Sequence, residues 1–132
     1  MPGNQVLVVE DETIIRLLVE EVLSDGGFEI ASAVTGEEAI ELLDNPAHEF
    51  VGLVTDIRLG DHLTGWDIAR HARELNPEIC IVYVSADSGD EWRSLGVPGS
   101  MFIQKPFASA QIVTAISTLL NAAGGQSGHA PD

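Results

Sequence analysis

The feature that most limits what this chain can fold into is a set of short apolar runs, most of which do not alternate with polar residues. A strand buried on one face shows alternation, whereas a strand covered on both faces reads as continuous Val, Ile and Leu. These runs therefore predict a parallel sheet with helices on both sides. They occupy residues 6–9, 28–31, 51–54, 79–84 and 101–103.

Helix-forming segments separate the runs. The first presents Ile14, Leu18, Val19 and Val22 as its apolar stripe and ends at a Gly-Gly pair, residues 26–27. Later helices begin at capping-box spacings, and the last ends before a second Gly-Gly pair, residues 124–125. We expect these later helices at about residues 36–45, 64–75, 90–95 and 109–120, followed by a disordered polar tail over residues 123–132.

Alternating strands and helices predict one α/β domain. Right-handed crossovers place helices on both faces, which gives a doubly wound (βα)5 fold with a five-stranded parallel sheet. The strand order expected for this flavodoxin-like arrangement is 2-1-3-4-5, with the second strand at an edge. Trp66 is expected at a helix edge and Trp92, on the short helix, at a partner contact.

Composition excludes several classes of function. The chain has 132 residues, enough for one domain, and a formal net charge of −15, which repels nucleic-acid phosphates and anionic lipid headgroups. We therefore expect no nucleic-acid or membrane partner. The start of the chain has no basic region and its longest unbroken apolar run is residues 79–84, so we also expect a cytoplasmic location. Cys80 is the single cysteine of the chain, which excludes an intrachain disulfide and argues against a cysteine-based zinc site.

Chemically capable side chains follow four of the five predicted strands, where open parallel sheets bind ligands. They are Glu10, Asp11, Asp56, Ser85 and Lys105. Two carboxylates about 4 Å apart repel by roughly 4 kcal/mol at an effective dielectric of 20, so something must offset a carboxylate cluster here. A shared proton or a Mg²⁺ ion are the two candidates, and the single lysine of the chain would supply further positive charge.

The sequences Val-Leu-Val-Val-Glu-Asp-Glu, Leu-Val-Thr-Asp, Val-Tyr-Val-Ser-Ala and Lys-Pro-Phe resemble the receiver domain of two-component response regulators in order and spacing. The resemblance covers residues 4–122 and implies a stand-alone receiver, a switch protein and not an enzyme. It implies that Asp56 accepts a phosphoryl group from a histidine kinase, a histidine phosphotransfer protein or acetyl phosphate. Slow self-dephosphorylation would end the signal.

The resemblance also implies a Mg²⁺ site. Asp11, Asp56 and the backbone carbonyl of Arg58 would bind the ion directly, and Glu10 would act through a water. Arg58 itself, beside three acids, could pair with one of them, and with Asp87 it matches family positions that affect the lifetime of the acyl phosphate.

The remaining roles concern the switch. Ser85 and Lys105 would each hold a phosphoryl oxygen, and Phe102 matches the switch aromatic that turns inward with Ser85. The Lys105–Pro106 bond looks like the cis peptide of the family. A downstream protein or a second copy of the chain would read the altered surface at about residues 90–120.

Four departures from the family pattern affect these expectations. The segment over residues 57–65 is one residue longer than usual and lacks the usual proline, so its conformation is open. The segment over residues 85–102 is about two residues short and rich in glycine, which predicts a reduced or mobile fourth helix. Glu10 replaces the commoner aspartate, and Phe102 replaces the usual tyrosine.

Other interpretations stay open at this stage. The triplet Glu10-Asp11-Glu12 is also typical of a solvated turn before a helix. A pseudo-receiver that binds proteins without being phosphorylated fits the altered loop. A metal-dependent phosphohydrolase needs a general acid where Arg58 stands, and a flavin or dinucleotide carrier needs a glycine-rich loop that the chain lacks.

Overall fold

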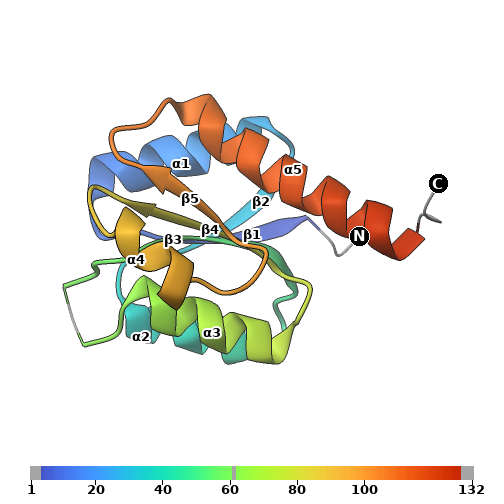
Figure 1. Ribbon diagram of the computed structural model, residues 1–132, viewed down its shortest axis with the longest axis horizontal. Helices are drawn as coiled ribbons and strands as arrows, with labels where there is room; N and C mark the ends of the chain where they lie inside the picture. Colours follow the sequence, from blue (N-terminus) through green and yellow to red (C-terminus); the bar gives the residue numbers. More distant parts are fainter. Residues whose placement is uncertain (1–3, 61, 129–132) are drawn as a thin grey trace.

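Five parallel strands form one sheet in the order β2-β1-β3-β4-β5 (Figure 1). The computed structural model describes residues 4–60 and 62–128. The five apolar runs of the sequence correspond to the five strands, and the expected strand order is confirmed. The strands are β1 (Gln5–Val9), β2 (Glu29–Ala33), β3 (Phe50–Asp56), β4 (Cys80–Ser85) and β5 (Met101–Gln104).

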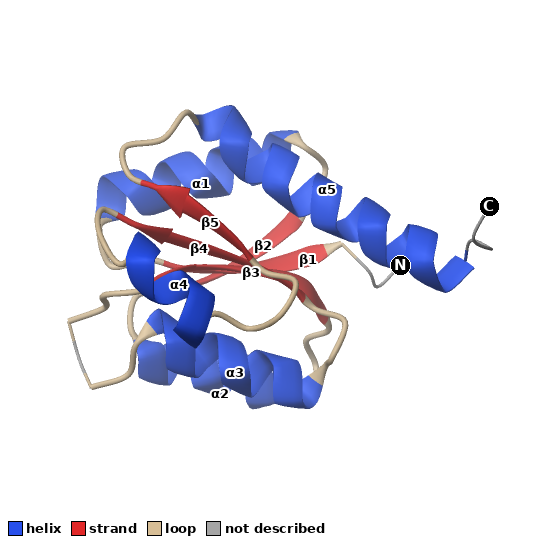
Figure 2. Ribbon diagram, viewed as in Figure 1, coloured by secondary structure: helices blue, strands red, loops and turns tan. Residues whose placement is uncertain are grey.

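Helices cover both faces of the sheet (Figure 2). One face packs against α1 and α5 and the other against α2 and α3, so each face has its own apolar core. This two-sided cover explains why β1, β3 and β4 lack polar alternation. The helices are α1 (Thr13–Asp25), α2 (Gly36–Asp44), α3 (Gly65–Leu75), α4 (Gly89–Leu95) and α5 (Ser109–Gly128).

The start of α3 is fixed by a capping box. The Thr64 hydroxyl accepts a hydrogen bond from the Asp67 N–H at 3.3 Å, and the Asp67 carboxylate accepts one from the Thr64 N–H at 2.9 Å. These two bonds satisfy backbone donors that a helix start otherwise leaves free. The box holds α3 directly beside the end of β3, where the Gly65 N–H donates to the Ile57 carbonyl at 2.9 Å.

The predicted apolar stripe of α1 is partly wrong. Val19 is buried as expected, but Ile14 is 76% exposed and Leu18 43% exposed, while Leu23 is buried. The helix carries apolar residues around most of its circumference, so periodicity alone does not decide which side faces the sheet. Packing against α5 and β2 selects the side.

Trp66 also differs from the prediction, because it is buried in the core and not at a helix edge. Its ring lies 4.7 Å from that of Tyr83 on β4, at a tilt of 54°. The Tyr83 hydroxyl in turn accepts a hydrogen bond of 3.1 Å from the Val97 N–H. This bond ties the loop after α4 to the centre of the sheet.

The predicted break of the last helix at residues 124–125 is wrong, because α5 continues to Gly128. Glycine in a helix costs about 1 kcal/mol relative to alanine but keeps both of its backbone hydrogen-bonding groups, so two glycines need not end a helix. Residues 129–132 of the expected tail lie outside the described residues, and the domain boundary at residue 122 stays a prediction. No helix in the described part of the chain is long and apolar enough to cross a membrane.

Candidate functional site

Three carboxylates converge at the carboxyl ends of β1 and β3. Glu10 and Asp11 follow β1, and Asp56 ends β3, the strand that pairs with it. One carboxylate oxygen from each lies within 4.8 Å of the others. Glu10 and Asp56 are buried, whereas Asp11 is exposed, so the cluster opens to solvent on one side. The sheet topology thus produces the cluster that strand-end positions predicted.

Lys105 supplies the positive charge of this cluster. Its Nζ lies 3.0 Å from Asp56 Oδ2, 3.1 Å from Glu10 Oε1 and 3.0 Å from Glu12 Oε1. Burial works to lower the pKa of Lys105, but its hydrogen bonds to Asp56 and Glu12 and the charge of Glu10 outweigh that effect and raise the pKa. The lysine is therefore a fixed cation that partly offsets the carboxylate repulsion. The Lys105–Pro106 peptide is cis, as expected.

Within the described part of the chain, one of the two carboxylate oxygens of Glu10 lacks a hydrogen bond. Its Oε2 accepts a hydrogen bond of 3.1 Å from the Glu12 N–H, but its Oε1 is fully buried and has no hydrogen-bond partner among the described residues. The 3.1 Å approach of Lys105 to this oxygen is an ion-pair distance without hydrogen-bond geometry. Burial and the nearby Asp56 charge raise the pKa of Glu10 to about 7.

This donor set fits a hard divalent cation. Mg²⁺ is held in proteins by one or two carboxylates together with waters, and it neutralises clusters of negative charge. The carboxylates of Glu10, Asp11 and Asp56 each offer one oxygen to a group whose atoms lie within 4.8 Å of one another, and the buried Oε1 of Glu10 accepts no hydrogen bond among the described residues. The cluster therefore has both the charge and the open side that such an ion requires.

Ser85 lies at the end of β4, buried, and next to the cluster in the sheet, since Val84 pairs with Asp56. Its Oγ donates a hydrogen bond of 3.2 Å to Asp87 Oδ1. The same carboxylate oxygen lies 3.0 Å from Arg58 Nε. Arg58 thus pairs with Asp87 and not with an acid of the cluster, and this exposed ion pair spans the loops after β3 and β4.

The loop after β3 is shaped by two glycines. Gly60 has a φ of 79°, in the left-handed region, and a Cβ there would lie 3.7 Å from Asp11 Oδ2. A Cβ on Gly65 would lie 2.4 Å from the Asp56 carbonyl oxygen, closer than two atoms can approach. The longer loop therefore still returns to the edge of the site, and α3 begins against the backbone of Asp56.

Phe102 lies on β5, outside the carboxylate cluster. It is half-buried beside α4, with its ring 6.2 Å from that of Trp92. Trp92 is itself half-buried and donates from its indole N–H to Ser100 Oγ at 2.9 Å. The short α4 is present as expected, and its role in a switch stays a prediction.

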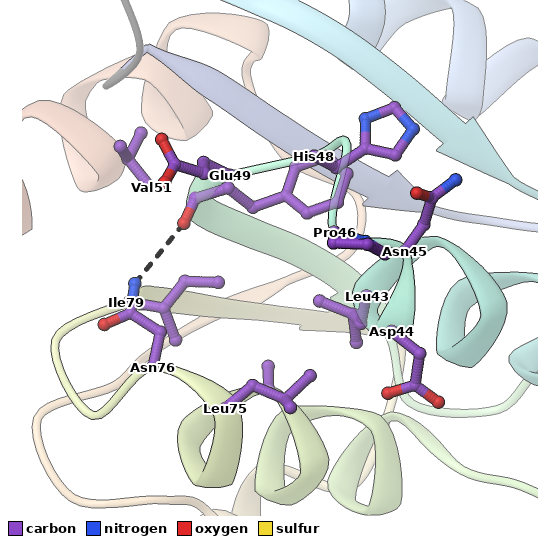
Figure 3. A pocket seen from close by; sticks show the side chains of 12 residues that line it. Leu43, Asp44, Asn45, Pro46, His48, Glu49, Val51, Leu75, Asn76 and Ile79 are labelled. Carbon is purple, nitrogen blue, oxygen red and sulfur yellow. Dashed lines mark hydrogen bonds between the residues drawn. The ribbon is translucent and has the colours of Figure 1, made fainter.

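The predicted site residues Glu10, Asp11, Asp56 and Lys105 are brought together, with Ser85 at the next strand end. Sequence reasoning missed the role of Glu12, an exposed acid whose Oε1 lies 3.0 Å from Lys105 Nζ. A cavity of about 660 Å³ lies at the opposite end of the sheet, between the ends of α2 and α3, and contains none of these residues (Figure 3).

Residues 6–117 match the family described as response regulator receiver domain. The chain belongs to this family. A solved structure of a response regulator receiver protein from Sinorhizobium medicae WSM419 is 44% identical, with a TM-score of 0.88, and the match covers 92% of this chain and 97% of that one. The domain described here is thus a receiver domain of the kind found in response regulators.

Curated relatives differ in length. Chemotaxis protein CheY from Thermotoga maritima is 25% identical, over 87% of this chain and 96% of that protein. The receiver domain spans about half the length of several matched transcriptional regulators. It spans 12% of sensor kinase CckA from Brucella abortus, which is 29% identical over 87% of this chain. The receiver unit therefore occurs in its relatives both as most of a protein and as one part of a longer one.

Proposed function

We propose that this receiver domain accepts a phosphoryl group on Asp56 and signals through the resulting change in its surface. The observation that carries the proposal is the 3.0 Å contact between the Lys105 ammonium and Asp56 Oδ2, in a cluster that also contains Glu10 and Asp11. A buried carboxylate with a dedicated cation and an open side is suited to nucleophilic attack on phosphorus.

The phosphodonor we propose is a phosphohistidine of a histidine kinase or phosphotransfer protein, with acetyl phosphate as a small-molecule substitute. An Asp56 carboxylate oxygen attacks the phosphorus, the new P–O bond forms, and the bond from phosphorus to the histidine nitrogen breaks. The leaving imidazole takes up a proton. The product is an acyl phosphate, which water later hydrolyses by attack on the same phosphorus.

The residues around Asp56 have distinct parts in this transfer. Lys105 already contacts Asp56 Oδ2 and is positioned to bind one phosphoryl oxygen. Ser85 is proposed to donate its hydroxyl to a second oxygen. The other oxygen of Asp56, Oδ1, accepts a hydrogen bond of 3.3 Å from the Arg58 N–H. The two oxygens of Asp56 therefore have different partners, and Oδ2 is the one that contacts Lys105.

Glu10, Asp11, Asp56 and the Arg58 carbonyl are the residues that would hold Mg²⁺. When bound, the ion supplies positive charge that lets an anionic donor approach a carboxylate cluster. We therefore expect transfer to require it. Signal readout is proposed to involve Phe102 and a protein partner or a second copy of the receiver.

Intact-mass spectrometry after incubation with acetyl phosphate and Mg²⁺ tests this function. The wild-type chain should gain the mass of one phosphoryl group, and Asp56→Asn should gain none. Omission of Mg²⁺ or addition of a chelator should also abolish the gain. Asp44→Asn, which removes an exposed acid at the far end of the sheet, is the matched control and should be phosphorylated like the wild type.

An adduct of equal amount on Asp56→Asn would contradict the proposal. Absence of any adduct on the wild-type chain, with both acetyl phosphate and a phosphohistidine donor, would favour the pseudo-receiver interpretation. Rapid turnover of a generic phosphate ester would instead favour a phosphohydrolase.

A further inference from the structure

The cavity of about 660 Å³ lies where two helices end, at the end of the sheet away from the phosphoacceptor site (Figure 3). The last residues of α2 and α3, the connection from α2 to β3 and the start of β3 line it. Its volume falls within the range of pockets that hold small molecules, about 300–1,000 Å³. A ligand bound there would occupy a site separate from that of the phosphoryl group.

Much of the lining of this cavity is apolar. Leu43 of α2, Leu75 of α3 and Ile79, just before β4, contribute their side chains to it. Leu75 is 52% exposed, so it presents apolar surface to water inside a hollow. A ligand with an apolar body would remove its own surface and that of Leu75 from water, which favours binding.

The edges of the cavity are negative. Asp44, at the end of α2, and Glu49, just before β3, lie at opposite edges, and no lysine or arginine is among the described residues that line it (Figure 3). The C-terminus of a helix carries partial negative charge, and both α2 and α3 end here. The last turn of α2 contains no basic residue that would offset this charge. The cavity therefore favours a positively charged ligand.

Glu49 is the acid of the cavity that is available to a ligand. The Asp44 carboxylate already has a partner, because its Oδ1 lies 2.6 Å from His71 Nε2. The Glu49 carboxylate is exposed and has no hydrogen-bond or ion-pair partner among the described residues. Arg73, in the last turn of α3, does not line the cavity and donates to the Ile79 carbonyl at 2.8 Å.

Contacts between the elements hold the walls of the cavity in place. The Asn76 amide, after α3, donates to the Phe50 carbonyl of β3 at 3.5 Å, the dashed line in Figure 3. The His48 ring stacks on that of Phe50, with 5.2 Å between centroids and 11° between planes, and its Nδ1 lies 3.3 Å from Gln5 Oε1. A cavity with walls fixed in this way loses little conformational entropy when it binds a ligand.

We propose that this cavity binds a small organic cation with an apolar body, of the class of the protonated arylalkylamines. The apolar body contacts Leu43 and Leu75, and the ammonium group pairs with Glu49. The proposal goes beyond phosphorylation of Asp56 and does not depend on it.

Titration of the chain with phenethylamine, followed by NMR of the backbone amides, tests this proposal. Two matched compounds separate the two features of the ligand, because phenethyl alcohol keeps the ring without the charge and ethylamine keeps the charge without the ring. Phenethylamine should shift the amide signals around the cavity, Leu75 among them, in a saturable way. We expect ethylamine to bind at least about tenfold more weakly, since it buries no ring. Phenethyl alcohol should bind at least about threefold more weakly, since it lacks the ion pair.

Variants of the chain test the two contacts separately. Glu49→Gln should weaken phenethylamine binding about threefold to fivefold, the upper range for an exposed ion pair, and should leave binding of phenethyl alcohol unchanged. Glu37→Gln is the control for charge, because it removes an exposed acid in the first turn of α2, away from the cavity. Leu75→Ala should weaken binding of both ring compounds by about threefold or more, since it removes buried methyl groups. Leu17→Ala is its control, because Leu17 is 54% exposed on α1. Both controls should change binding by less than about twofold.

Equal binding of phenethylamine and phenethyl alcohol would overturn the proposal, since the cavity would then not recognise charge. Equal weakening by Glu49→Gln and Glu37→Gln would also overturn it, because it would show only a general attraction of cations to an acidic chain. Shifts confined to amides outside the cavity, or no saturable shift up to the solubility limit of the amine, would overturn it as well.

Discussion

The Lys105 ammonium lies 3.0 Å from Asp56 Oδ2, although the two residues are 49 positions apart in the sequence. The side chains are 11% and 8% exposed, so the pair is largely shielded from solvent. Glu10 adds a second buried negative charge 3.1 Å from the same nitrogen. One positive charge therefore faces two buried carboxylates, and a bound divalent ion would neutralise the remaining negative charge.

Replacement of Lys105 by Met leaves Glu10 and Asp56 without their cation. Breaking a buried ion pair costs about 3–5 kcal/mol, and since this pocket opens on the Asp11 side we expect a loss of about 2–3 kcal/mol at pH 8 without Mg²⁺. Urea unfolding measures this loss in the free energy of unfolding. Addition of Mg²⁺ should restore part of the stability, because it supplies the missing charge.

The control for this prediction is Glu12→Gln. Glu12 also contacts Lys105 at 3.0 Å, but its side chain is 60% exposed. An exposed pair contributes less than about 1 kcal/mol, so this variant should be close to wild type in stability. Equal stability of Lys105→Met and wild type would show that the lysine does not compensate the buried acids.

Gly65→Ala should displace the backbone of the proposed phosphoacceptor, Asp56. The added Cβ would meet the Asp56 carbonyl oxygen at 2.4 Å, so the end of β3 or the start of α3 must shift. We expect a loss of about 1–3 kcal/mol and slower phosphorylation by acetyl phosphate. Gly89→Ala is the control, because its nearest neighbour, the Phe102 ring, lies at an ordinary 3.4 Å. Wild-type rates in Gly65→Ala would contradict the close approach.

The capping box of α3 should give a pH-dependent contribution to stability. Hydrogen bonds from the Thr64 N–H and hydroxyl, together with Arg70, lower the pKa of Asp67. A lowered pKa means that the folded state favours the charged carboxylate, so this stability is present at neutral pH and is lost as the pH falls through the folded-state pKa.

Asp67→Asn tests the pH-dependent contribution of the Asp67 carboxylate to stability. At pH 7 the variant should be less stable than the wild type by about 1 kcal/mol, a usual value for a capping residue. The difference should narrow as the pH is lowered in urea unfolding experiments. A difference that stays constant with pH would show that the charge of Asp67 does not contribute.

Tyr83→Phe should loosen the loop between α4 and β5. The Val97 N–H donates to the Tyr83 hydroxyl at 3.1 Å, and both residues are buried. Phenylalanine keeps the ring contact with Trp66 but leaves that N–H unpartnered, at a cost of about 1–3 kcal/mol. Hydrogen exchange at the Val97 amide should accelerate, and unchanged exchange would show that the bond is not a significant restraint.

The sheet was predictable because its strands are apolar on both faces. Continuous apolar runs such as residues 79–84 predict both the strands and their parallel pairing. In a parallel sheet the residues that follow the strands, here Asp11, Asp56 and Lys105, lie at the same end of the sheet. The sequence therefore predicted which residues form the site.

Side-chain partners were less predictable. Which side of α1 is buried depends on packing, and Ile14 and Leu18 were placed on the wrong side. The partner of Arg58 was also open, since several acids follow the predicted strands; in the structure it is Asp87, next to the turn residue Ser88 with its φ of 71°. Such choices depend on loop conformation, which the sequence specifies only weakly at this glycine-rich segment.

The most direct test of the central claim is to locate the phosphoryl group. The wild-type chain is treated with acetyl phosphate and Mg²⁺, the acyl phosphate is reduced with borohydride, and the product is digested and sequenced by mass spectrometry. Reduction converts a phosphorylated aspartate to homoserine. We expect homoserine at Asp56 and at no other aspartate. Homoserine at Asp11 or elsewhere, with Asp56 unmodified, would contradict the account.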